Sequence, residues 1–148
     1  MPYLKITCMV LETEKYTNIA HALTDAVNDL FYNPKAHLTR EELRERTTVH
    51  LTPYKDDEFY IGGRTPLQPK QQDITIEISD WYMSVKQQKK LAAELTPIVA
   101  RLFSVADNQM DNINLRFHSY PPTDFAVGGK LLSERIPAIG RFAKKWFG

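Results

Sequence analysis

Three polar side chains on one short segment are the strongest candidates for chemistry in this sequence. Within residues 113–120, Asn114, Arg116 and His118 alternate with apolar residues. Successive side chains of a strand point to opposite faces, so a strand here would place all three on one face. An arginine in such an apolar segment is costly to bury unless it is paired or bound. Arg116 is therefore a candidate ligand-binding residue, the alternative being a structural ion pair with an Asp or Glu.

Histidine and cysteine residues do not form a metal-binding pattern. His50 lies on an earlier segment, 47–53, that also reads as a strand, and it is either a site residue or an ordinary surface or core histidine. His21 and His37 show no ligand spacing with Cys8 or with carboxylates, so no metal is expected. A single cysteine excludes an intrachain disulfide, and no secretory signal opens the chain. We therefore expect a reducing, cytoplasmic setting.

The composition fits one globular domain without a strong charge. The chain has 148 residues, of which 43% are hydrophobic and 25% charged, and a chain of this length can bury a substantial core. With 19 Lys and Arg against 18 Asp and Glu, the net charge is +1, too small an excess to favour nucleic acid. No run approaches the ~18 apolar residues of a membrane span. We expect neither nucleic acid nor membrane as a partner.

Two glycine pairs mark an internal repeat. Gly62-Gly63 and Gly128-Gly129 lie 66 residues apart, and the similar segments Glu58–Ile61 and Asp124–Val127 precede them. Upstream, a helical apolar pattern recurs with every member displaced by 72 residues. The two sets are Ile19, Leu23, Ala26, Val27, Leu30, Phe31 and Leu91, Leu95, Ile98, Val99, Leu102, Phe103. This spacing predicts one amphipathic helix in each half.

Each predicted helix lies between two predicted strands. Residues 3–10 and 73–79 precede the helices with alternating apolar and polar residues, and 47–53 and 113–120 follow them. A crossover helix normally makes its two strands parallel, so each half is a β-α-β unit. The tandem units predict an α/β (α+β) fold, a four-stranded mixed sheet with two helices on one face. The uncovered face predicts association with further copies, sheet against sheet.

Smaller features complete the predicted organisation. The fall in offset from 72 to 66 places six extra residues in the first half, where Thr39–Arg46 can form a short capped helical turn. Pro97 should kink the second helix or mark its effective start. We expect a single domain of two pseudo-repeats, residues 2–66 and 72–132, with a basic, aromatic tail at 133–148. This tail is expected to dock on a neighbouring subunit, the alternative being contact with an anionic lipid or ligand.

Together these features resemble the tautomerase superfamily, which includes 4-oxalocrotonate tautomerase and macrophage migration inhibitory factor. The resemblance is carried by the opening Met1-Pro2-Tyr3-Leu4-Lys5-Ile6, by the β-α-β unit and by a Phe-x-Ile/Val-Gly-Gly turn that occurs twice. It extends to about Lys130. The chain looks most similar to the fused members, in which two units form one subunit and three subunits form a trimer. This resemblance implies a homotrimeric isomerase that needs no cofactor.

Pro2 is the catalytic residue that the resemblance implies. In the family the initiating methionine is removed, and the exposed proline nitrogen, a secondary amine, transfers the proton. Chain-terminal amines titrate near pH ~7.7–8.0, so such an amine can act as a general base close to neutral pH. A small second residue favours removal of Met1, whereas a retained Met1 would make the Pro2 nitrogen a non-basic amide. The second half has no free amine, so one site per chain is expected.

The same resemblance implies a small 2-oxo or enol carboxylic acid as substrate. Arg116 is then the expected carboxylate clamp, and Asn114 is a possible hydrogen-bond donor. Phe59 and Phe125 match the aromatic residue that lines the family's pocket just before its glycine pair. Only one of the two is expected to border the site, and core packing is the alternative for either. His50 lies on the corresponding strand of the first half.

Two other functions stay open. One is a lyase or hydratase of the same superfamily, such as a decarboxylase or dehalogenase, and the other is a non-catalytic oligomeric binding protein. The lyase and hydratase branches carry arginines after the second half's first strand. This chain has none there, since the segment reads Asp80-Trp81-Tyr82-Met83-Ser84-Val85-Lys86. Glu12 likewise stands where simple tautomerases carry an arginine after the first strand.

Overall fold

The computed structural model describes residues 1–36, 38–65 and 73–136. Its main strands are β1 (Tyr3–Met9), β2 (Thr48–Tyr54), β3 (Ile74–Trp81) and β4 (Ile113–Tyr120). Its helices are α1 (Thr13–Phe31), α2 (Arg40–Glu45), α3 (Val85–Leu102) and the one-turn α4 (Leu132–Arg135). A small hairpin is formed by β5 (Ala126–Val127) and β6 (Lys130–Leu131). His37 and most of the expected docking tail, residues 137–148, lie outside the described residues.

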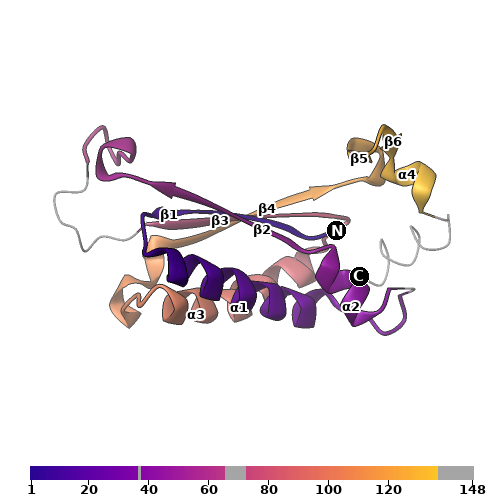
Figure 1. Cartoon of the computed structure of the whole chain (residues 1–148), viewed down its shortest axis with the longest axis horizontal. Helices are drawn as coiled ribbons and strands as arrows, with labels where there is room; N and C mark the ends of the chain where they lie inside the picture. The colour runs from indigo at the N-terminus through magenta and orange to yellow at the C-terminus, as the bar shows by residue number, and fades with distance from the viewer. Residues whose placement is uncertain (37, 66–72, 137–148) are drawn as a thin grey trace.

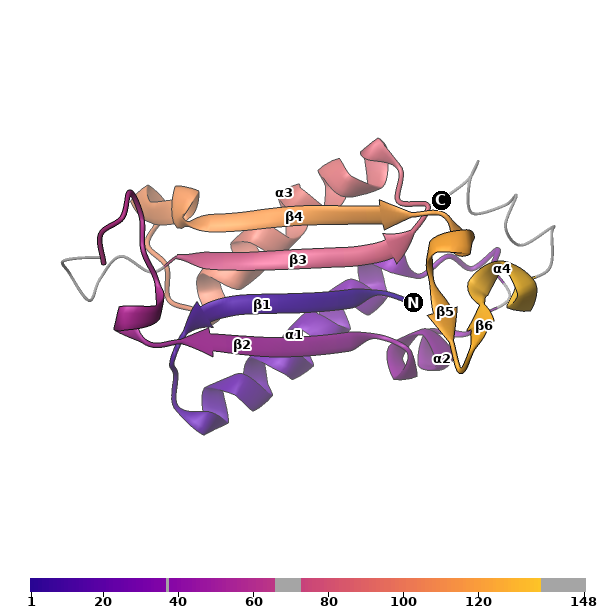
Figure 2. The same ribbon diagram turned by 90° about the horizontal axis from the view of Figure 1, so that it is seen from above.

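The fold has two layers, a four-stranded sheet and a pair of long helices. Figure 1 shows α1 and α3 along one face of the sheet, and Figure 2 shows the strand order β2-β1-β3-β4. β1 and β2 are parallel, β3 and β4 are parallel, and the central strands β1 and β3 are antiparallel. Each half is therefore a β-α-β unit. The predicted mixed sheet with two helices on one face is confirmed.

Alternate residues of the central strands and one stripe of each long helix form the core. Ile74, Ile76 and Ile78 of β3 are fully buried, as are Leu4 and Ile6 of β1. Every apolar position of the two predicted helix stripes packs into this same core. Burying one such side chain stabilises the fold by about 1.5–3 kcal/mol. The period of the apolar pattern thus predicts correctly which helix faces meet the sheet.

α2 is the short capped helix that the sequence predicts for residues 39–46. The Thr39 hydroxyl accepts a hydrogen bond from the Glu42 N–H at 3.1 Å, and the Glu42 carboxylate accepts one from the Thr39 N–H at 2.8 Å. The Asn28 side chain donates to the Arg40 carbonyl at 2.7 Å, which ties α2 to α1. Both contacts fix the position of α2. Its C-cap residue, Arg46, is therefore held at a defined place just before β2.

One expectation for Pro97 is wrong. This proline does not mark the effective start of the second helix, since α3 begins at Val85 and runs through Pro97 to Leu102. The start is set instead by Ser84, whose hydroxyl accepts a hydrogen bond from the Gln87 N–H at 3.1 Å. Serine is a strong N-cap residue, because its side chain satisfies an N–H that has no partner within the helix. This cap decides where α3 begins.

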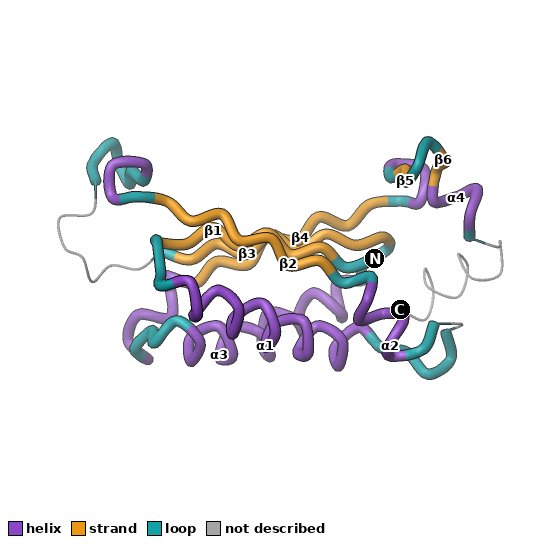
Figure 3. Tube along the Cα trace, viewed as in Figure 1, coloured by secondary structure: helices purple, strands orange, loops and turns teal. Residues whose placement is uncertain are grey.

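The two glycine pairs form equivalent turns at opposite ends of the sheet. Gly62 and Gly63 have φ of 58° and 74°, and Gly128 and Gly129 have φ of 57° and 78°. Two successive residues with positive φ make the tight hairpin turn that favours glycine. Figure 3 shows both turn regions on the side of the sheet away from the helices, the second one beside β5 and β6.

The face of the sheet away from the helices is polar. Lys5 Nζ lies 3.6 Å from Glu77 Oε2, and His118 Nε2 lies 3.4 Å from Glu77 Oε1. Arg116 is the register partner of Glu77 on β4. Such partly exposed ion pairs contribute only about 0–1 kcal/mol each. This face is therefore a charged surface, which the helices and strands of the described residues leave uncovered.

Candidate functional site

Pro2 borders an open pocket of about 630 Å³ at one end of the sheet. At this end β1 begins, whereas β3 and β4 finish, because β1 is antiparallel to β3. Pro2 is buried, and its carbonyl accepts a hydrogen bond from the Thr48 N–H at 3.0 Å. The lining residues are Met1, Pro2, Tyr3, Glu45, Arg46, Thr48, Ser79, Tyr120 and Phe125. The pocket thus combines a proline, a cation and three aromatic rings.

A buried carboxylate lies beside the start of the chain. Asp80 continues the buried row of β3 that Ile78 precedes, and it is only 1% exposed. Its Oδ1 lies 2.7 Å from the Met1 ammonium nitrogen. Continuing the register of Tyr3 with Ser79 by one residue places Pro2 opposite Asp80. Asp80 is therefore next to the position where a terminal amine on Pro2 would lie.

Tyr120 and Phe125 form an aromatic wall of the pocket. Their ring centroids are 5.6 Å apart, with the planes tilted by 37°. Burial raises the pKa of the Tyr120 phenol to about 12, and the negative charge of Asp80 adds to this effect. The phenol therefore keeps its proton at neutral pH and remains a hydrogen-bond donor.

The cation of this pocket is Arg46, which sequence reasoning missed. Arg46 is the exposed C-cap residue of α2, about two helical turns after the Thr39 cap. The sequence does contain a sign that Arg46 lies near Pro2, because the N-terminal ends of two parallel strands lie at the same edge of a sheet. Arg46 stands just before β2 and Pro2 just before β1, and these strands are parallel. The predicted helical turn therefore had to bring its last residue close to Pro2.

His50 lies next to this pocket without lining it. Its Nδ1 is 3.0 Å from the hydroxyl of Tyr3, which does line the pocket. The two rings meet edge to face, with centroids 6.4 Å apart. His50 is exposed on β2. It can orient the Tyr3 hydroxyl but does not reach Pro2 in the described chain.

The other predicted residues lie elsewhere in the chain. Phe59 stacks on Tyr54, centroids 4.7 Å apart, at the opposite end of the sheet. Asn114 lies at that end too, where its amide donates to Asp73 Oδ2 at 3.5 Å. Arg116 stands in the middle of the sheet on the charged face, level with Glu77. One chain thus brings Phe125 to Pro2, and leaves Phe59, Asn114 and Arg116 away from it.

The opposite end of the sheet repeats the aromatic wall with different chemistry. Tyr54 and Phe59 are the counterparts of Tyr120 and Phe125, each displaced by 66 residues. The nearby acid is Asp73, whose pKa burial raises, while a hydrogen bond from Thr75 and the charge of Arg116 lower it. The Tyr54 hydroxyl donates to the Asp73 carbonyl at 2.7 Å. This end lies in mid-chain, so removal of Met1 produces no terminal amine here.

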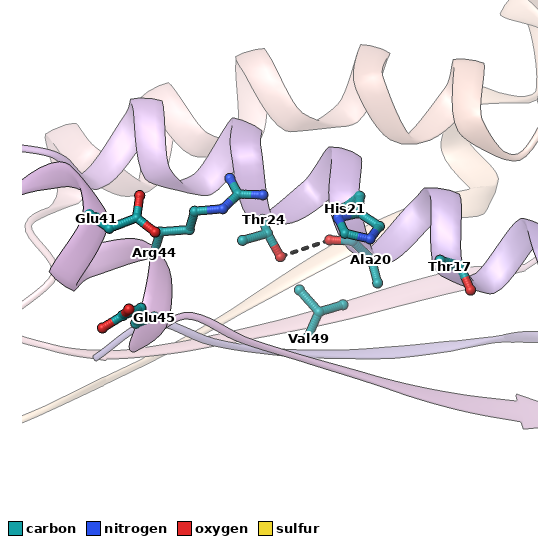
Figure 4. Close-up of a pocket in the computed structure, with 8 residues that line it drawn as sticks. All are labelled: Thr17, Ala20, His21, Thr24, Glu41, Arg44, Glu45 and Val49. Carbon is teal, nitrogen blue, oxygen red and sulfur yellow. Dashed lines mark hydrogen bonds between the residues drawn. The ribbon is translucent and has the colours of Figure 1, made fainter.

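A second open pocket, of about 490 Å³, lies between α1, α2 and β2. Figure 4 shows its lining, with the Thr24 hydroxyl turned back to the Ala20 carbonyl. Its arginine, Arg44, is ion-paired with Asp25. His21 is the titratable nitrogen in this pocket. No proline is among the residues that line it, whereas Pro2 lines the other pocket, so the Pro2 pocket is the better candidate site.

Metal and thiol chemistry find little support in the part of the chain that the structure describes. There, no three His, Cys, Asp or Glu side chains gather closely enough to hold a metal ion. Cys8 is buried, and burial raises its thiol pKa to about 11, so it is protonated at neutral pH and a poor nucleophile. None of the described helices combines the length and apolar character of a membrane span.

Solved structures resemble this chain closely, although no sequence-family model and no curated protein matches it. It is 19% identical to a structure described as "F6 fused 4-OT wild type asymmetric trimer", with a TM-score of 0.72, covering 90% of this chain and 98% of the other. N1, of the cis-3-chloroacrylic acid dehalogenase family, is 16% identical, with a TM-score of 0.66 and coverage of 96% and 97%.

A macrophage migration inhibitory factor-like protein from Entamoeba histolytica is 15% identical. Its TM-score is 0.61, and the match covers 88% of this chain and 97% of that protein. At such low identities the likeness establishes the backbone arrangement, which agrees with the two β-α-β units described above. The chain therefore has the tautomerase-superfamily fold in its fused, two-repeat form.

Proposed function

We propose that this protein is a tautomerase, which moves a proton between carbon and oxygen of a small 2-oxo or enol carboxylic acid. The observation that carries the proposal is Pro2 in a pocket that also holds Arg46 and Tyr120. With Met1 removed, Pro2 presents a secondary amine to this pocket. No cofactor is required, because the carbonyl next to the reacting carbon makes that carbon acidic.

The proposed proton transfer has two steps. The neutral Pro2 nitrogen first takes a proton from the carbon beside the carbonyl. The electron pair of the C–H bond forms the C=C bond of the enolate, and the π pair of the carbonyl moves to its oxygen. The Tyr120 phenol donates a hydrogen bond to the resulting enolate oxygen, and Arg46 binds the substrate carboxylate. The Pro2 ammonium then returns its proton to the enolate oxygen. The reverse sequence converts an enol to its ketone, with Pro2 first as the acid.

Phe125 and the polar strand residues have supporting roles in this proposal. Phe125 covers the apolar part of the substrate and excludes water from the amine. Arg116 and Asn114 face the open side of the sheet, so we assign them to the Pro2 site of a neighbouring copy. Phe59 can approach a neighbour in the same way, while His50 orients Tyr3 within its own chain.

A homotrimer follows from this assignment. The charged face around Glu77 is left uncovered by its own helices, and the fused 4-OT structures that share this fold are described as trimers. Association of three sheets would bring the Arg116 of one copy towards the Pro2 of the next. Sedimentation equilibrium should report a mass of three chains, and a monomer would contradict this part of the proposal.

A lyase or hydratase, such as a decarboxylase or dehalogenase, is the second candidate. It is favoured by Asp80, whose buried carboxylate lies 2.7 Å from an ammonium and suits a proline that begins the reaction as an acid. One structural neighbour belongs to the cis-3-chloroacrylic acid dehalogenase family. Release of halide or CO2 from such acids would support this candidate over the isomerase. A non-catalytic binding protein is the remaining alternative, and it predicts that no tested acid is turned over.

The test combines intact mass with a rate measurement. Mass spectrometry should show that Met1 is absent from the purified protein. Ketonisation of phenylpyruvate enol or 2-hydroxymuconate is then followed for the wild type and Pro2→Ala. General acid–base catalysis typically contributes about 10²–10⁴-fold, so we expect Pro2→Ala to lose about 100-fold in rate. Equal rates for the two proteins would remove Pro2 from the chemistry of these substrates.

A further inference from the structure

Asp80 is an ionisable side chain on the core-facing row of a central strand. Ile74, Ile76 and Ile78 are the fully buried residues that precede it on the same face of β3, and Asp80 itself is 1% exposed. A buried carboxylate is costly unless a cation and hydrogen bonds compensate its charge. The cation that the structure places on Asp80 is the ammonium of Met1, at 2.7 Å.

Removal of Met1 would leave a Pro2 ammonium, in place of the Met1 ammonium, near Asp80. Successive Cα atoms are ~3.8 Å apart, so the new terminal nitrogen forms about one residue from the old one. The β1–β3 register, continued by one residue, places Pro2 directly opposite Asp80. The hydrogen bond from the Thr48 N–H to the Pro2 carbonyl holds the residue there. Once Met1 is removed, the Pro2 ammonium is the cation that the β1–β3 register places beside Asp80.

We propose that Asp80 is a positioning residue that holds the proton on the Pro2 nitrogen and so sets the pH at which Pro2 can act as a base. This inference rests on the proposed function for the reaction it controls. An adjacent opposite charge favours the charged form of an amine. Asp80 therefore makes the ammonium the resting form of the site, and the base-first direction of the reaction becomes faster as the pH rises.

The other charged and titratable groups around Pro2 have weaker effects. Among the described residues that line the pocket, they are Tyr3 from β1, Glu45 from α2, the α2 C-cap residue Arg46, and Tyr120 from β4. Glu45 and Arg46 are both exposed and carry opposite charges, so solvent screens each of them. Burial of Pro2 opposes protonation, whereas the buried Asp80 charge acts at short range and favours it. The Asp80 carboxylate therefore decides the direction in which the pKa of the Pro2 amine is shifted.

The experiment is a titration of the Pro2 nitrogen by 15N NMR in protein labelled with 15N-proline and lacking Met1. For the wild type we expect an apparent pKa above the ~7.7–8.0 of ordinary terminal amines. Asp80→Asn, which keeps the shape and removes the charge, should lower this pKa by about 1 to 3 pH units. Glu77→Gln, on the other face of the same strand, should leave it unchanged.

Two results would overturn the inference. One is a wild-type Pro2 pKa at or below the ordinary range, which needs no variant and so does not depend on how Asp80→Asn folds. The other is the same Pro2 pKa in folded Asp80→Asn as in the wild type. The rate of ketonisation against pH gives an independent readout, since its base limb should move to lower pH in Asp80→Asn by the same interval.

The same data separate this inference from the proposed function. A raised Pro2 pKa that depends on Asp80, in a protein that turns over no 2-oxo or enol acid at any pH, keeps the inference and removes the tautomerase activity. Turnover that depends on Pro2, with a pKa indifferent to Asp80, keeps the activity and removes the inference. A retained Met1, seen by intact mass, leaves no titrating proline and contradicts both.

Discussion

The backbone N–H of Thr48 donates a hydrogen bond to the carbonyl of Pro2 at 3.0 Å. This contact extends the parallel pairing of β1 and β2 by one step beyond the strands themselves. It holds the end of α2 against the start of β1 and so fixes Arg46 beside the proline. The proximity of Pro2 and Arg46 follows from the parallel pairing of β1 and β2. Mutation can remove the Arg46 side chain without changing this pairing.

Arg46→Gln should weaken the binding of carboxylate substrates. Loss of a charge-assisted contact to a carboxylate costs about 1.5–3 kcal/mol, which corresponds to a rise in KM of about 10- to 100-fold. Steady-state kinetics with a keto acid measures it. Arg44→Gln is the matched control, because Arg44 belongs to the same helix but pairs with Asp25 in the other pocket. Equal KM values for Arg46→Gln and the wild type would exclude Arg46 from the site.

Arg116 should act on the Pro2 of a neighbouring copy. Arg116→Ala alone is expected to raise KM for carboxylate substrates. Mixed oligomers of Arg116→Ala with Pro2→Ala should then regain activity, because some interfaces combine an intact Pro2 with an intact Arg116 from the other chain. Refolding the two variants together, with each refolded alone as the control, measures this recovery. Absence of any recovery would show that the two residues do not share a site across an interface.

Tyr120→Phe should lower kcat with little change in KM, because its hydroxyl is proposed to bind the oxygen that becomes negative during the reaction. Loss of one such donor typically costs about 10²-fold or more. The Tyr120 pKa of about 12 also means that ionisation of this phenol removes no activity below pH 10. Tyr54→Phe, its counterpart at the other end of the sheet, is the control. Equal effects of the two substitutions on kcat would argue against a role for Tyr120.

Thr39→Ala should destabilise the fold and disturb Arg46 together. Removing an N-cap hydroxyl typically costs about 1 kcal/mol, and Arg46 is the C-cap residue of α2, which Thr39 caps. Urea unfolding should show the loss in free energy of unfolding, and kinetics should show a raised KM. Thr39→Ser, which keeps the hydroxyl, should restore both. A stable Thr39→Ala protein with normal KM would mean that the cap does not position Arg46.

The architecture is largely predictable from the sequence, because each repeat contains both the helical spacing and the strand alternation of apolar residues. The helical spacing of Leu91 and Leu95 identifies the face that meets the sheet, and the alternation of Ile74 to Ile78 identifies a strand with one buried face. A crossover helix then makes each strand pair parallel. Local pattern and global fold agree, so these predictions are confirmed. Pro97 lies inside α3 without starting it, because the Ser84 cap sets the first turn of the helix.

The side chains that surround Pro2 were harder to predict from the sequence than the fold, for a geometrical reason. Alternation assigns Asn114 and Arg116 to a face of β4 but does not say which end of the sheet lies near Pro2. That depends on the antiparallel pairing of β1 with β3, a long-range contact that no local pattern contains. Asp80 could have been identified from the sequence as a candidate residue. It continues the alternating row of isoleucines on β3, and a charged side chain buried in such a row needs a partner. A charged residue at a position where the pattern predicts an apolar one is commonly a functional residue.

The most direct test of the central claim is hydrogen exchange at carbon in D2O. A 2-oxo acid with hydrogens beside its carbonyl is incubated with the protein lacking Met1, and 1H NMR follows their replacement by deuterium, whichever tautomer dominates. We expect rapid exchange with the wild type and about 100-fold slower exchange with Pro2→Ala. Exchange at the same rate with both proteins would contradict the claim that the Pro2 nitrogen carries the proton.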